Sequence, residues 1–112
     1  MDKDFAYDYS EEGIRFLLDS YRELASLNGI REPVRDFMID VTEALHKSKH
    51  ITERQEEVVK LRYMAPIDVE DYVAYTAEQL GISPRTVQYD STNAIKEIYI
   101  YLNGVRGWRT KS

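Results

Sequence analysis

Apolar residues in the first half of the chain recur at helical spacing and predict two helices. Ser10, followed by Glu11 and Glu12, marks the start of the first, because acidic side chains stabilise the positive end of a helix dipole. Asn28-Gly29 is expected to end it, and the second helix begins near Glu32-Pro33. The apolar stripes are Ile14, Leu17, Leu18, Tyr21, Leu24 and Ala25 in the first helix and Val34, Phe37, Met38, Val41 and Leu45 in the second.

Two amphipathic helices joined by a short turn form a helical hairpin. Two interpretations of its stripes stay open. They pack on each other and on the rest of the chain, as such stripes usually do, or they form a dimer or partner surface. The hairpin also has an acidic face, which is either solvated or meets a basic patch on RNA polymerase. The residues of this face are Asp19, Glu23, Asp36, Asp40 and Glu43.

The second half of the chain predicts two further helices before a tight turn. Thr52 and Gln55 have the spacing of a capping box, so a third helix is expected to start at Thr52. Pro66 stops this helix, and the acidic residues 68–71 open another that runs to about Leu80. The inward-facing residues are Val58, Val59, Leu61 and Met64 in the third helix and Val73, Ala77 and Leu80 in the fourth.

Gly81 predicts the tight turn, because glycine adopts left-handed backbone conformations readily. Ser83 can cap a new helix, and Pro84 suits its first position because it lacks the amide hydrogen that would go unpaired there. Two helices joined by so short a turn are the helix-turn-helix arrangement, whose second helix suits the major groove of DNA. The inward face of this last helix is Val87, Ala94, Ile95 and Ile98, and Ser91 interrupts it.

Residues 51–64 (ITERQEEVVKLRYM) and 77–87 (AEQLGISPRTV) resemble region 4 of sigma-70-type factors and the related bacteriophage regulators of the ArpU or RinA kind. The resemblance covers roughly half of the chain, and LuxR-type response-regulator domains share much of the same pattern. The chain departs from the family in its longer loop at residues 65–71 and in Thr76, where family members commonly have isoleucine or valine.

The resemblance implies that the helix beginning at Ser83 contacts bases and phosphates, and that the helix beginning at Thr52 braces it from behind. Arg54 and Arg62 on the bracing helix reach phosphate, or they are ordinary solvated charges. The DNA contacts implied for the last helix are Arg85, Thr86, Gln88, Tyr89, Thr92 and Asn93.

The chemistry of these side chains suits DNA, with one exception. Arginine can bond guanine twice, glutamine can bond adenine, and threonine or tyrosine can bond phosphate or pack on a thymine methyl group. Asp90 is the exception, because an aspartate facing the duplex repels phosphate unless it accepts from a cytosine amine. We therefore expect weak binding by a lone monomer, and either a dimer that reads two half-sites about 34 Å apart or help from RNA polymerase.

Composition limits the classes of protein to consider. A chain of 112 residues is one domain, or one small domain with a helical extension, and 43% hydrophobic with 31% charged residues is typical of a soluble globular protein. The chain has no cysteine, no apolar run as long as a membrane span and an acidic start unlike a secretory signal, so we expect a cytoplasmic location without membrane contact. The net charge is -5, but residues 83–112 carry five basic and two acidic side chains.

No arrangement of residues indicates an enzyme, a cofactor or a metal site. A cysteine nucleophile and a glycine-rich phosphate loop are both missing, and the carboxylates match solvated helix faces better than a paired acid and base. His46 and His50 have the spacing of a helical ligand pair, but no third ligand is evident, and Lys47 and Lys49 would repel a cation.

The sequence thus predicts an all-α protein with a helical hairpin at residues 1–50, a helix-turn-helix domain at 51–103 and a basic, flexible tail at 104–112. By resemblance it is a DNA-binding transcription regulator of phage or prophage type, which activates transcription by binding double-stranded DNA upstream of a promoter and contacting RNA polymerase. The competing hypothesis is a protein-interaction module that binds RNA polymerase or a sigma factor without reading DNA.

Overall fold

One long helix organises the protein. The structure is a computed structural model that describes residues 10–26 and 32–111. Within these residues there is no strand, and the fold is all-helical as predicted. The helices are α2 (Glu11–Ser26), α3 (Glu32–Lys47), α4 (Glu53–Val59), the π-helical turn η1 (Lys60–Met64), α5 (Tyr72–Leu80) and α6 (Pro84–Lys111).

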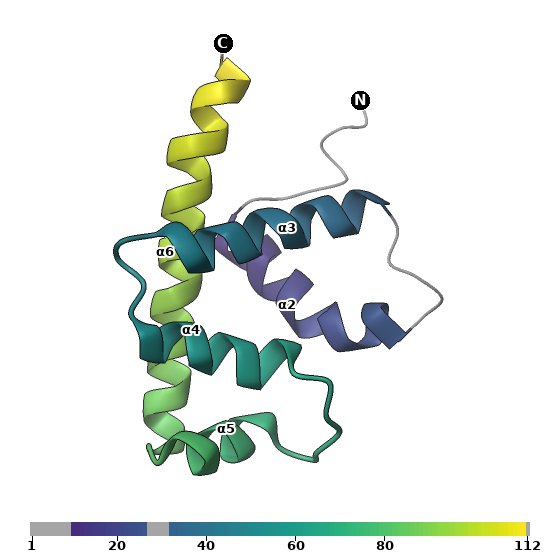
Figure 1. Cartoon of the computed structure of the whole chain (residues 1–112), viewed down its shortest axis with the longest axis vertical. Helices are drawn as coiled ribbons and strands as arrows, with labels where there is room; N and C mark the ends of the chain where they lie inside the picture. Colours follow the sequence, from purple (N-terminus) through teal and green to yellow (C-terminus); the bar gives the residue numbers. More distant parts are fainter. Residues whose placement is uncertain (1–9, 27–31, 112) are drawn as a thin grey trace.

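Helix α6 contains 28 residues and is therefore about 42 Å long at 1.5 Å per residue. Helices α4 and α5 lie beside its N-terminal part, and α2 and α3 lie beside its middle (Figure 1). The other helices thus attach to α6 at two levels, and each level has its own hydrophobic core.

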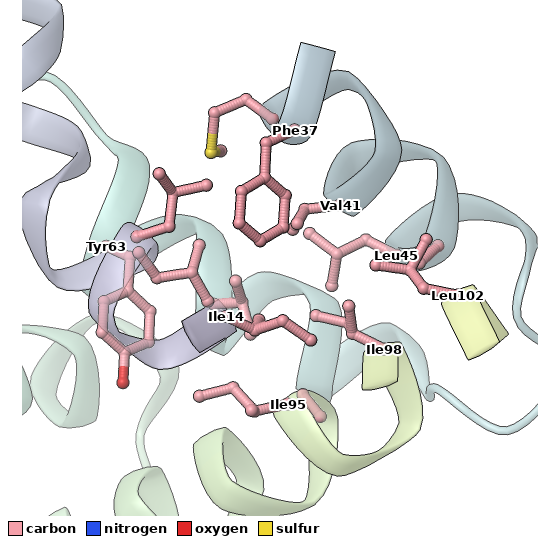
Figure 2. Close-up of a cluster of buried hydrophobic side chains, with 14 residues drawn as sticks. Ile14, Phe37, Val41, Leu45, Tyr63, Ile95, Ile98 and Leu102 are labelled. Atoms are coloured by element: carbon pink, nitrogen blue, oxygen red, sulfur yellow. The ribbon is translucent and has the colours of Figure 1, made fainter. Parts of the chain in front are cut away.

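The large core joins α2 and α3, the two helices of the expected hairpin, to the rest of the chain (Figure 2). It contains residues of both predicted domains, since Leu18 of α2 and Leu45 of α3 are in the same cluster as Ile98 of α6. The apolar stripes of α2 and α3 are therefore buried in one core with α6, which agrees with the first of the two interpretations. The buried residues of the large core are Ile14, Leu17, Leu18, Phe37, Met38, Val41, Ala44, Leu45, Val59, Tyr63, Ala94, Ile95, Ile98 and Leu102.

The small core lies where α4, α5 and the start of α6 meet. Its buried residues are Val58, Ala77 and Val87, one from each helix. Val73, Leu80 and Ile82 pack against it from partly buried positions. Thr76 of α5 is also fully buried, and its hydroxyl finds no hydrogen-bond partner among the described residues.

The predicted helix starts are confirmed by hydrogen bonds. Thr52 Oγ1 accepts from the Gln55 amide at 3.1 Å, and Gln55 Oε1 accepts from the Thr52 amide at 3.0 Å, which completes the capping box. Asp71 Oδ1 caps α5 by accepting from the Ala74 amide at 3.1 Å. At the start of α6, Ser83 Oγ accepts from the Thr86 amide at 3.0 Å.

Gly81 ends α5 in the left-handed conformation, with φ at 67°. The Ile82 amide then donates to the Ala77 carbonyl at 3.0 Å, which closes the turn. The chain between α5 and α6 is therefore only three residues long, as the glycine and the serine cap predict.

Arg22 of α2 makes a contact that the sequence did not reveal. Its guanidinium donates to the carbonyls of Leu61, Arg62 and Ala65 at 2.8, 2.6 and 2.7 Å, at the end of η1 where carbonyls lack helical partners. The guanidinium carbon also lies 3.7 Å from the centre of the Tyr72 ring. Desolvation by burial lowers the pKa of Arg22. This one side chain ties the hairpin to the loop before α5.

Several expectations differ from the structure or fall outside it. Tyr63, absent from the expected core, is 3% exposed, whereas Leu61 and Met64 are only partly buried. The π-helical turn explains the shift, because one extra residue per turn rotates the following side chains. The expected helix end at Asn28-Gly29 lies outside the described residues, as do the side chains of Ala25 and Val34.

The expected flexible tail at residues 104–112 begins inside a helix, because α6 continues to Lys111. A glycine within a helix costs only about 1 kcal/mol relative to alanine, so Gly104 does not by itself end one. Residue 103 therefore does not mark a helix boundary.

Candidate nucleic-acid interface

The N-terminal half of α6 has an exposed polar side. Arg85, Gln88, Tyr89 and Thr92 are all exposed, and their spacings of three, four and seven residues place them on one side of the helix. Lys96 continues the same row one turn later and is also exposed. We call these five residues the outward face of α6. Tyr89 is the most prominent apolar group on it, with 67% of its surface exposed.

The side chains of the outward face are not used to hold the fold. None of the five makes a hydrogen bond or an ion pair with another residue that the structure describes. Arginine, lysine and glutamine carry strong hydrogen-bond donors, so a surface of this kind can bind an external acceptor without first losing an internal contact.

Thr86 and Asn93 lie at the edges of this surface. Both are partly buried. The Thr86 hydroxyl lies 2.9 Å from Ser83 Oγ, and the Thr86 amide donates to the same oxygen, so Thr86 belongs to the helix cap. The Asn93 side chain makes no hydrogen bond with the other described residues. Asn93 is thus a contact at the margin, and Thr86 mainly shapes the start of α6.

Asp90 does not lie on the outward face, and the expectation that it would face a duplex is wrong. The residue is 1% exposed. Its carboxylate accepts from Arg54 of α4, with Nε to Oδ2 at 2.7 Å and Nη2 to Oδ1 at 3.3 Å. Asp90 follows Val87 by three residues and precedes Ala94 by four, so it shares their inward side. That spacing was visible in the sequence, but an aspartate is rarely placed in a core without a known partner.

Arg54, expected at phosphate, is instead bound to Asp90. The two hydrogen bonds occupy its Nε and one Nη2 hydrogen, and 54% of its side chain remains exposed. A paired guanidinium attracts phosphate less than a free one, because the carboxylate offsets its charge. The pair joins the first turn of α4 to the second turn of α6, and Arg54 therefore helps to fix the position of α6.

Arg62 lies on a different surface. Its guanidinium carbon is 4.9 Å from the centre of the Tyr63 ring, and it lines a hollow with Asp19, Glu70 and Asp71. No residue of α6 lines that hollow. The structure therefore does not bring Arg62 together with the outward face, and the acidic groups around it oppose binding of a polyanion.

The charge of α6 is favourable to an anion along its exposed first half. Between Pro84 and Lys96 the exposed charged residues are Arg85 and Lys96, and the acid in this segment is the buried Asp90. The net charge of -5 for the chain consequently does not describe this surface. The acids lie elsewhere, many of them exposed on α2, α3 and the loop before α5.

His46 and His50 are not brought together with a third ligand among the described residues. His46 Nδ1 lies 3.0 Å from Glu56 Oε2, and no group of three His, Cys, Asp or Glu residues in the described part of the chain could hold a metal ion. The helices of residues 10–26 and 32–111 are also too short or too polar for any of them to cross a membrane.

Comparison of the chain with models of protein families, with curated proteins and with solved structures gives no match. The function therefore has to be inferred from the surface itself.

Proposed function

We propose that the protein is a DNA-binding transcription regulator and that α5 and α6 form a helix-turn-helix of the sigma-region-4 type. The observation that carries the proposal is the outward face of α6, which is exposed, basic and free of internal contacts. An α-helix fits the major groove, where polar side chains can read the edges of the bases.

The local framework supports this role. The turn closed by Gly81 and the cap by Ser83 fix the start of α6 relative to α5. Val87 packs between Val58 and Ala77, and the Arg54–Asp90 pair adds a second connection to α4. Three helices thus hold the polar side of α6 outward, which lowers the entropy lost when its side chains bind.

The residues divide by chemistry into two kinds of contact. Arg85 and Gln88 are the candidates for base readout, since arginine can make two bonds to guanine and glutamine two to adenine. Tyr89 and Thr92 suit phosphate or a thymine methyl group, and Asn93 is placed at the edge of the groove. Because this surface carries few cations, one copy of the protein should bind DNA with modest affinity. The proposal therefore includes either a second copy bound at a neighbouring half-site or a contact with RNA polymerase.

A protein-interaction module is the second candidate. The observation favouring it is the acidity of the hairpin, where Glu12, Asp19, Glu23 and Asp36 are exposed. An acidic surface can meet a basic patch on RNA polymerase or a sigma factor without any contact to DNA. Asp90 adds nothing to this candidate because it is buried and paired.

A salt series of DNA binding separates the two functions. The purified protein is titrated onto duplexes from its own genomic neighbourhood between 50 and 200 mM salt, values at which phosphate contacts weaken steeply. A DNA reader binds at low salt and loses affinity linearly on a double-logarithmic plot. Absence of binding at low salt, together with capture of RNA polymerase, contradicts the first proposal and supports the second.

Variants of the outward face locate the contact. Arg85→Ala and Gln88→Ala should each cost about 1 to 3 kcal/mol of binding free energy on the specific duplex, with helicity unchanged. Arg35→Ala is the matched control, because Arg35 is an exposed arginine on α3, away from α6. A loss for Arg35→Ala as large as that for Arg85→Ala would show that charge alone is measured and would remove Arg85 from base readout. Unchanged binding by Gln88→Ala would remove Gln88.

A further inference from the structure

The turn between α3 and α4 lies beside α6 (Figure 1), and residues of both segments line one hollow. A hollow of about 260 Å³ has Lys49 and His50 of this turn on one side and Glu97 and Ile100 of α6 on the other. Glu97 directly follows Lys96, the last residue of the outward face. The turn therefore meets α6 at the level along the helix where the outward face ends.

Two lysines here have no internal role. Lys49 and Lys96 are exposed, and neither forms an ion pair or a hydrogen bond with another described residue. The acid among the residues that border the hollow from α6 is Glu97, which is partly buried. Lys49 borders the hollow, and Lys96 directly precedes Glu97 in α6, so each of the two segments that meet at the hollow carries one unpaired lysine.

The end of α3, from which the turn starts, is attached to α6. Glu43 of α3 accepts from the Tyr101 hydroxyl at 3.2 Å, and its Oε2 lies 3.8 Å from Lys47 Nζ. Since Tyr101 belongs to α6, the last turn of α3 is attached to α6 at the level of the hollow. A surface ordered in this way loses less entropy on binding than a mobile loop.

The spacing of the charges along α6 matches an extended polyanion. Lys96 is eleven residues after Arg85, which corresponds to about 16 Å along the helix axis. The major groove of B-DNA is about 12 Å wide. A helix whose first turns enter the groove therefore brings its fourth turn to the phosphates at the edge of that groove.

We infer that Lys49 and Lys96 form a second DNA-binding surface, which contacts backbone phosphates and extends the interface along α6 onto the turn between α3 and α4. The inference rests on the proposed function. Lys49 and Lys96 would raise the affinity for DNA of any sequence, whereas Arg85 and Gln88 would select the sequence by contacting bases.

The test is the salt dependence of binding to a duplex of unrelated sequence. Lys49→Gln and Lys96→Gln should each make the plot of log affinity against log salt less steep, by about 0.9 in the magnitude of its slope. Each should also weaken binding on the order of ten-fold at 0.1 M salt. Glu97→Gln should strengthen binding at low salt, because it removes the carboxylate that borders the hollow together with Lys49. Arg35→Gln, which makes the same change of charge on α3, should leave the slope unchanged.

The outcomes distinguish this inference from the proposed function. If the wild-type protein binds no DNA at low salt, both are overturned. If it binds and Arg85→Ala weakens specific binding, while the lysine variants keep the wild-type slope, only the second surface is overturned. Circular dichroism, measured at the temperature of the binding titrations, verifies that every variant remains helical.

Discussion

Two parts of the fold, around the middle and around the start of α6, are held by different kinds of contact. Around the middle of α6, the hairpin is attached through the large core, which contains fourteen buried residues among those described. Around the start of α6, the small core has three buried residues, and polar groups supply much of the remaining framework. These are the Arg54–Asp90 pair and the caps formed by Asp71 and Ser83.

This difference has a consequence for function. Apolar burial is proportional to area and has no direction, whereas hydrogen bonds and ion pairs fix orientation. The end with the outward face thus depends on directional contacts to orient a short helix segment. The hairpin end supplies most of the hydrophobic stabilisation.

The largest loss of stability should come from the large core. Ile98 is fully buried, and Ile98→Ala should lower the free energy of unfolding by about 2 to 5 kcal/mol through lost burial and the cavity left behind. Ile100 on the same helix is 47% exposed, and Ile100→Ala should cost about 0.5 kcal/mol or less. Urea denaturation measures both, and similar losses would mean that the hairpin does not pack on α6 as described.

The next largest loss of stability should come from the Arg54–Asp90 ion pair, near the start of α6. Arg54→Ala should destabilise the protein by about 3 kcal/mol, because it leaves the buried Asp90 carboxylate without its partner. The double variant Arg54→Ala/Asp90→Ala should lose less than Arg54→Ala alone, since the buried charge is then absent. A double variant less stable than the single one would show that the pair does not compensate Asp90.

A smaller loss is expected at the turn between α5 and α6. Gly81→Ala should cost about 1 to 2 kcal/mol, because a side chain at φ of 67° is strained even though the space around it is open. Gly104→Ala is the control, since Gly104 also has open space but lies in helical backbone, and alanine there should be neutral or stabilising. Thermal unfolding of both variants compares them, and a neutral Gly81→Ala would contradict the conformation of the turn.

The smallest effect concerns alkaline pH. Desolvation by burial raises the pKa of Tyr63, so the folded state keeps the phenolic proton when the unfolded chain begins to lose it near pH 10. The stability from this group is complete below about pH 10 and is lost as the pH rises through the folded-state pKa. Tyr63→Phe should therefore flatten the decline in stability above pH 10. Tyr89→Phe, at a ring that is 67% exposed, should leave the decline unchanged, and equal behaviour of the two variants would contradict the burial of Tyr63.

Much of the local structure could be predicted because its causes are close together in the sequence. The capping box at Thr52, the turn at Gly81 and the cap at Ser83 each depend on residues within a few positions of one another. Helical periodicity likewise predicted that Arg85 and Gln88 would be exposed.

The contacts that could not be predicted join distant parts of the chain. Arg22 reaches carbonyls about forty residues away, and Arg54 pairs with Asp90 across 36 residues. The sequence does not reveal that Arg54 is the partner of Asp90, and a charged aspartate without a known partner is expected on the surface. This single placement assigned a negative charge to the exposed side of α6, where the structure places none between Pro84 and Lys96.

The central claim is that the outward face of α6 lies against a duplex. The most direct measurement is an NMR titration of the isotope-labelled protein with a DNA duplex whose binding site has been identified by footprinting. It maps the changes in backbone amide chemical shift along the chain. The largest changes should fall on residues 83–96, with smaller ones at Lys49 and His50. Changes concentrated on α2 and α3, with the amides of residues 83–96 unaffected, would contradict the claim.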